Sequence, residues 1–72
     1  MEYYEIVVKY MIDKKRVRDF LGMQFKYLPE GNTLIFGTLN DHTELSLIVN
    51  KLRDLNIPII SLKKEVIGGQ YE

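Results

Sequence analysis

The sequence predicts an α+β fold of the ferredoxin-like class, βαββαβ, in which a four-stranded antiparallel sheet carries two helices on one face. Three observations predict it: apolar residues alternate with period two in several segments, recur at helical spacing in two others, and flank a dense turn signal at the middle of the chain. The order of these segments, with short connections, is that of the split βαβ arrangement. The right-handed crossover rule then places the first and third strands at the centre.

The first predicted strand covers Tyr3–Ile12, where apolar residues alternate with mixed ones. Its apolar row is Tyr4, Ile6, Val8, Tyr10 and Ile12. A strand with one buried face and one partly wet face explains this pattern.

A short first helix is expected next, with Asp13 as its N-cap and Gly22 at its end. Val17, Phe20 and Leu21 recur at helical spacing, but they span only about two turns. Such a helix is not stable alone in water, so packing on the sheet must hold it.

Turn-forming residues are densest at Pro29-Glu30-Gly31-Asn32, between two runs rich in aromatic and β-branched residues. The stretch Met23–Leu39 therefore predicts a β-hairpin. Both rows of its second strand, Thr33–Leu39, are largely apolar, which predicts a central strand. The pattern leaves open which row faces the helices.

The second helix is expected to begin at Asp41, which with Glu44 resembles a capping box, and to end at Asn56. Its apolar stripe is Leu45, Ile48, Val49, Leu52 and Leu55. A last strand, Ile59–Val66, has Pro58 near its start, as suits an edge position. We therefore expect a single domain over residues 1–66 and a flexible tail over residues 67–72.

Composition bounds the function. The 72 residues carry ten basic and ten acidic side chains and no cysteine, which excludes disulfides and thiolate metal sites. A domain of this size buries only a small core, so self-association is a plausible source of added stability. No apolar run suits a membrane span and no signal-peptide pattern is present, so we expect a cytoplasmic protein with no membrane role.

Enzyme chemistry is not expected. His42 is the single histidine, and no carboxylate cluster, nucleophile motif or phosphate-binding glycine loop accompanies it. We expect neither a catalytic residue nor a metal or other cofactor, and interpret His42 as a surface residue.

Two surfaces are candidates for binding. Lys14, Lys15 and Arg16 would open the first helix, where free N–H groups could bind a small anion, although such a run is more commonly a solvated edge. The helix-free face of the sheet is expected to present Tyr3, Val7, Lys9, Lys26 and Lys63. That face could pair with a second copy, face a protein partner, stay wet in a monomer, or bind nucleic acid, which the zero net charge disfavours.

The element order, Gly22 after the first helix and the Leu55-Asn56-Ile57-Pro58 exit from the second resemble small regulatory ferredoxin-like domains of the ACT and NIL families. This resemblance implies an amino-acid-sensing or regulatory role, with a ligand-contacting turn at Ile12-Asp13-Lys14. The segment Leu55–Glu65 is also similar to the appendage that follows some bacterial ABC-type ATPase domains.

The first functional hypothesis is a non-catalytic regulatory or assembly module that forms a homodimer. The alternatives are a nucleic-acid-binding module that uses the open face and a small-anion or amino-acid sensor. The predicted core residues are Ile6, Val8, Tyr10, Val17, Phe20, Phe25, Ile48, Leu52 and Ile60.

Overall fold

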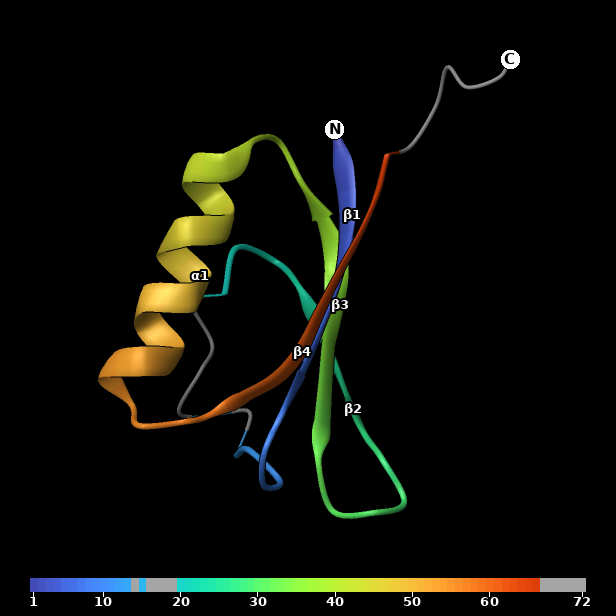
Figure 1. Cartoon of the computed structure of the whole chain (residues 1–72), viewed down its shortest axis with the longest axis vertical. Coiled ribbons are helices and arrows are strands. Elements are labelled where there is room, and N and C mark those ends of the chain that lie inside the picture. Colours follow the sequence, from blue (N-terminus) through green and yellow to red (C-terminus); the bar gives the residue numbers. More distant parts are fainter. Residues whose placement is uncertain (14, 16–19, 67–72) are drawn as a thin grey trace.

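The computed structural model describes residues 1–13, 15 and 20–66. It contains strands β1 (Glu2–Val8), β2 (Gln24–Tyr27), β3 (Thr33–Leu39) and β4 (Ile59–Val66), with helix α1 (His42–Asp54) between β3 and β4. Figure 1 shows α1 on one side of the sheet. The predicted tail, residues 67–72, lies outside the described residues.

The four strands form one antiparallel sheet in the order β2-β3-β1-β4. The central positions of β1 and β3 confirm the placement that the crossover rule predicted. In the observed register, Ile6 of β1 lies opposite Ile35 of β3 on one side and Leu62 of β4 on the other. Opposite residues project to the same face, so these three side chains share the face that carries α1.

The prediction of a ferredoxin-like fold with two helices is wrong, because α1 is the one α-helix among the described residues. Residues 14 and 16–19 of the predicted first helix, Val17 included, lie outside the described part of the chain. At its predicted ends, Asp13 and Leu21 are not helical, and Leu21 has a left-handed φ of 54°. At the described end of this segment, the left-handed φ of Leu21 departs from the helical geometry that the spacing of Phe20 and Leu21 predicted.

The hairpin between β2 and β3 is confirmed. The N–H of Leu28 donates to the carbonyl of Asn32 at 2.8 Å, and the N–H of Gly31 donates to the carbonyl of Leu28 at 3.0 Å. Gly31 has a φ of 92°, which a residue with a Cβ atom adopts at a cost. The turn residues therefore specify this reversal locally.

Helix α1 begins at the predicted cap. Asp41 is extended, and its Oδ1 accepts from the N–H of Glu44 at 3.2 Å. The carboxylate of Glu44 accepts in return from the N–H of Asn40 at 2.8 Å, so two donors at the helix start are satisfied reciprocally. The chain leaves the helix through Asn56, whose left-handed φ of 58° ends it as predicted.

The core lies between α1 and the sheet. Its buried members are Tyr4, Ile6, Val8, Ile12, Phe20, Met23, Ile35, Leu39, Ile48 and Leu52. The prediction is confirmed for Ile6, Val8, Phe20, Ile48 and Leu52, and Phe25 packs against them while partly buried. On β3, the row containing Thr33, Ile35 and Leu39 is buried, which settles the face that the pattern left open.

Two predicted core residues are exposed instead: Tyr10 by 58% and Ile60 by 53%. β1 ends at Val8, and Tyr10 has a φ of 74°, so the alternation of the strand does not extend to it. Ile60 lies at an irregularity of the β1–β4 pairing, on an edge strand, where the alternation is interrupted.

The segment that follows β1 is tied to the hairpin. The buried Thr33 hydroxyl donates to the carbonyl of Tyr10 at 2.8 Å and accepts from the N–H of Ile12 at 3.0 Å. The Tyr27 hydroxyl donates to the carbonyl of Ile12 at 2.7 Å. These bonds hold the segment against the β2 side of the molecule.

Candidate functional site

The most distinctive exposed surface is the outer edge of β4. This strand is eight residues long and pairs on one side only, with β1. The N–H and C=O groups that point away from β1 along such an edge are available to another strand. Ile59, Ile60 and Leu62 expose 37%, 53% and 43% of their surface there.

The register of β4 explains how these aliphatic side chains come together. Leu62 lies opposite Ile6, and Ile59 lies opposite Val8, both of which face α1. Ile60 falls at the step where the pairing shifts between these positions. The three residues, called the β4 apolar strip below, therefore form a short stretch of apolar surface on the edge strand.

Helix α1 leaves this strip uncovered. α1 contacts β3, which lies on the other side of β1 from β4. A shallow groove of about 230 Å³ remains between the helix and the start of β4, lined by Val49, Arg53, Ile57, Pro58 and Ile59. The apolar strip thus has an adjoining recess that another chain could fill.

The predicted open-face residues are only partly brought together. Tyr3, Val7, Lys26 and Lys63 lie on strand positions that share the face opposite α1. Lys9 follows the end of β1, where its N–H donates to the carbonyl of Pro58 at 3.0 Å. It is therefore not part of the strand surface that the prediction assigned to it.

Carboxylates interrupt the basic character of this open face. The Tyr3 hydroxyl donates to Oε2 of Glu5 at 2.8 Å, and this bond raises the pKa of Tyr3. Glu5 lies opposite Lys63, and Glu65 lies opposite Tyr3. A negative charge beside the aromatic ring disfavours a nucleic-acid backbone at this position.

The predicted anion site falls mostly on residues that the structure does not describe, because Lys14 and Arg16 lie outside the described residues. Lys15 is exposed, and its N–H donates to Oδ1 of Asp13 at 2.9 Å. The described part of this segment therefore gives its N–H group to a carboxylate of the same chain.

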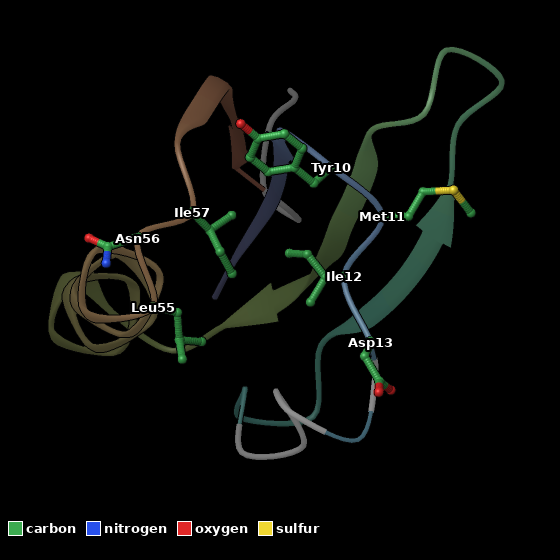
Figure 2. Close-up of a pocket in the computed structure, with 7 residues that line it drawn as sticks. All are labelled: Tyr10, Met11, Ile12, Asp13, Leu55, Asn56 and Ile57. Atoms are coloured by element: carbon green, nitrogen blue, oxygen red, sulfur yellow. The ribbon is translucent and has the colours of Figure 1, made fainter.

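A second hollow lies at the end of β1, and its lining includes Ile12 and Asp13, which the resemblance to ACT and NIL domains placed in a ligand-contacting turn. Its volume is about 280 Å³, and its walls come from the segment after β1 and from the end of α1 (Figure 2). The lining residues are Tyr10, Met11, Ile12, Asp13, Leu55, Asn56 and Ile57. The left-handed φ of Tyr10, which no local pattern signals, helps to form this wall.

No group of three or more His, Cys, Asp or Glu side chains in the described ranges is placed to hold a metal ion. His42 is exposed at the start of α1. Within the same ranges, no helix has the length and apolar character needed to cross a bilayer.

Comparison with known proteins identifies a family but no characterised relative. The family model of the domain of unknown function DUF8691 matches residues 3–63, which include β2, β3 and α1 in full, β1 from Tyr3 and β4 as far as Lys63. Neither a curated protein nor a solved structure matches the chain. Since the match covers most of the sequence, the chain belongs to the DUF8691 family.

Proposed function

We propose that this protein is a non-catalytic assembly module that forms a homodimer through the β4 edge, in a regulatory or scaffolding role. The observation that carries the proposal is the exposure of Ile60 and Leu62 on a long edge strand. Pro58, Lys63 and Lys64 blunt parts of this edge, and the apolar side chains between them are left exposed to another chain.

A second copy of the same strand suits this edge. Its free backbone groups supply the ladder hydrogen bonds, and a second copy brings an apolar side chain, Leu62, to the same edge. Two identical edges related by a two-fold axis form a closed interface, the commonest arrangement of homodimers. The zero net charge of the chain adds no overall repulsion between copies.

The open face offers less support for the nucleic-acid alternative. Of its aromatic residues, Tyr3 is bonded to Glu5 and Phe36 lies opposite Glu5, which also lies opposite Lys63. Neither arrangement favours stacking of bases beside phosphate contacts.

The test is the molar mass in solution, measured by light scattering over a wide range of protein concentration. Leu62→Lys places a third charge beside Lys63 and Lys64 on the edge, and we expect it to raise the dimer dissociation constant by at least about 30-fold. Leu47→Lys is the matched control, because Leu47 is an exposed leucine on α1, away from the edge. We expect it to leave the dimer unchanged.

Two results would contradict the proposal. One is a wild-type chain that stays monomeric at the highest concentration reached. The other is a Leu62→Lys variant that remains as dimeric as the wild type while its circular dichroism shows an intact fold.

A further inference from the structure

We infer that the two copies join as an antiparallel β4–β4 pair whose two-fold axis passes at Leu62, so that both α1 helices lie on the same face of one continuous sheet. This inference rests on the proposed function and deepens it by specifying the register of the interface. Three features of β4 select the register: its charges, its irregular step and its apolar strip.

The geometry of the pair restricts the choices. A two-fold axis perpendicular to the sheet keeps each residue on the same face in both copies. Residues directly opposite one another share a face. The axis must therefore pass beside one residue of β4, which then lies opposite the same residue of the other copy. Each residue of β4 therefore defines one possible register.

Charge disfavours an axis in the second half of β4. An axis at Lys63 or Lys64 would set that lysine against the same lysine of the other copy, and like charges directly opposite are destabilising. An axis at Glu65 would oppose two carboxylates in the same way. Registers with the axis at Lys63, Lys64 or Glu65 are therefore less stable than registers with the axis nearer the β4 apolar strip.

The irregular step disfavours an axis in the first half. The pairing of β4 with β1 shifts between Ser61, opposite Val7, and Ile59, opposite Val8, which leaves Ile60 as the extra residue. Such a step disrupts the ladder and bends the strand. An axis at Ser61 would set the irregular residue Ile60 opposite Leu62 of the other copy, so the regular ladder would include Ser61 alone.

An axis at Leu62 satisfies both conditions. The ladder centred there includes Ser61–Lys63 before either end reaches the irregular step at Ile60, and Leu62 of each copy covers the other at the axis. Ser61 lies opposite Lys63 of the other copy, and Ile60 lies opposite Lys64, whose alkyl stem can cover it. The ammonium of Lys64 already has an anionic neighbour, since its Nζ lies 3.6 Å from Oε2 of Glu2.

Single-cysteine variants test the register directly, because the chain has no native cysteine. Directly opposite residues have Cα atoms about 4.5–5.5 Å apart, within the range of a disulfide, whereas diagonal neighbours at about 7–8 Å are out of reach. Under mild oxidation, we expect Leu62→Cys to form a covalent dimer. Ser61→Cys and Lys63→Cys should each fail alone but cross-link when mixed, and this mixture retains Leu62.

The outcomes separate the register from the assembly. Cross-linking of Ser61→Cys with itself, or no cross-linking of either the Leu62→Cys variant or the mixture while light scattering still shows a dimer, would overturn the register and leave self-association standing. A monomeric wild type would overturn both. Gln24→Cys on the β2 edge serves as the control for random collision and should not cross-link.

Discussion

The two edges of this sheet differ in almost every property that governs strand pairing. The β2 edge is four residues long and exposes Gln24 and Lys26, while its apolar Phe25 lies against Phe20 with ring centroids 5.7 Å apart. The β4 edge is twice as long and exposes the β4 apolar strip. The two edges therefore differ in length and in the aliphatic surface that they expose.

The difference teaches that strand composition alone does not decide which edge is open. Both edge strands contain apolar residues and lysines. On the β2 side, Tyr27 and Thr33 bond to the segment after β1, and the ring of Phe25 lies against Phe20. No comparable contact among the described residues covers Leu62.

The largest expected effect comes from removing the ring that protects the β2 side. Phe20→Ala should lower the free energy of unfolding by about 3–5 kcal/mol, because Phe20 is buried and its loss leaves a cavity. Ile60→Ala on the β4 edge should change it by less than about 1 kcal/mol. Urea unfolding measures both, in a Leu62→Lys background so that dimer dissociation does not contribute. Equal losses would show that the two edges do not differ in packing.

The next effect concerns the bonds that hold the segment after β1. Thr33→Val keeps the shape of the side chain but leaves the carbonyl of Tyr10 and the N–H of Ile12 without their partner, at a cost of about 2 kcal/mol. Thr38→Val is the matched control on the same strand, because Thr38 is exposed, and should change stability by less than about 0.5 kcal/mol. Thermal unfolding of both variants distinguishes them; a neutral Thr33→Val would rule out this anchor.

A smaller effect is expected where the chain passes from α1 into β4. Asn56→Ala should cost about 1 kcal/mol, since alanine tolerates a φ of 58° poorly, whereas Asn56→Gly should be close to neutral. Asn50→Ala, at an exposed position inside α1, should be neutral or slightly stabilising. If Asn56→Gly were as destabilising as Asn56→Ala, the backbone conformation would not be the cause.

The smallest expected effect is a pH dependence that links β1 to the β4 edge. The Tyr4 hydroxyl donates to the carboxylate of Glu2, which lowers the pKa of Glu2 with a further contribution from Lys64, and the same bond raises the pKa of Tyr4 to about 12. The stabilisation from ionised Glu2 is therefore present above its ordinary pKa of 4.5 and is lost as the pH falls through the lowered value. The stabilisation from neutral Tyr4 is lost as the pH rises through about 12.

Unfolding midpoints between about pH 2 and pH 6 test the acid side of this dependence. Glu2→Gln should flatten the loss of stability toward low pH, because the substituted side chain does not titrate. Glu30→Gln, at an exposed position in the hairpin turn, serves as the control. An acid profile that Glu2→Gln leaves unchanged would contradict the assignment.

Much of the local structure could be predicted from the sequence. Pro29-Glu30-Gly31-Asn32 specified the hairpin, Asp41 and Asn56 specified the limits of α1, and the span Ile59–Val66 was predicted as observed. These signals are local, because turn and cap residues act on backbone groups within a few positions of themselves. The prediction of two helices was wrong, because α1 is the one α-helix among the described residues.

The candidate site was less predictable. Ile60 was expected in the core because alternation treats every apolar residue on a strand as buried, and the irregular step against β1 has no signature in the sequence. Lys9 was assigned to the open face because the strand was expected to continue beyond Val8. At both Lys9 and Ile60, the way in which β1 and β4 pair decides where the side chain lies.

By itself, the sequence determined the span of β4, the hairpin, the caps of α1 and the central place of β1 and β3, but not the end of β1. The tertiary structure decided which edge of the sheet is covered, since that depends on contacts between segments distant in the sequence, such as Thr33 with Tyr10 and Phe20 with Phe25. The alternation of apolar residues along a strand predicts the face of the sheet on which each residue lies. It does not predict whether another element packs on that face. Burial on an edge strand is therefore a property of the assembled chain, and β4 remains exposed because α1 packs on β3.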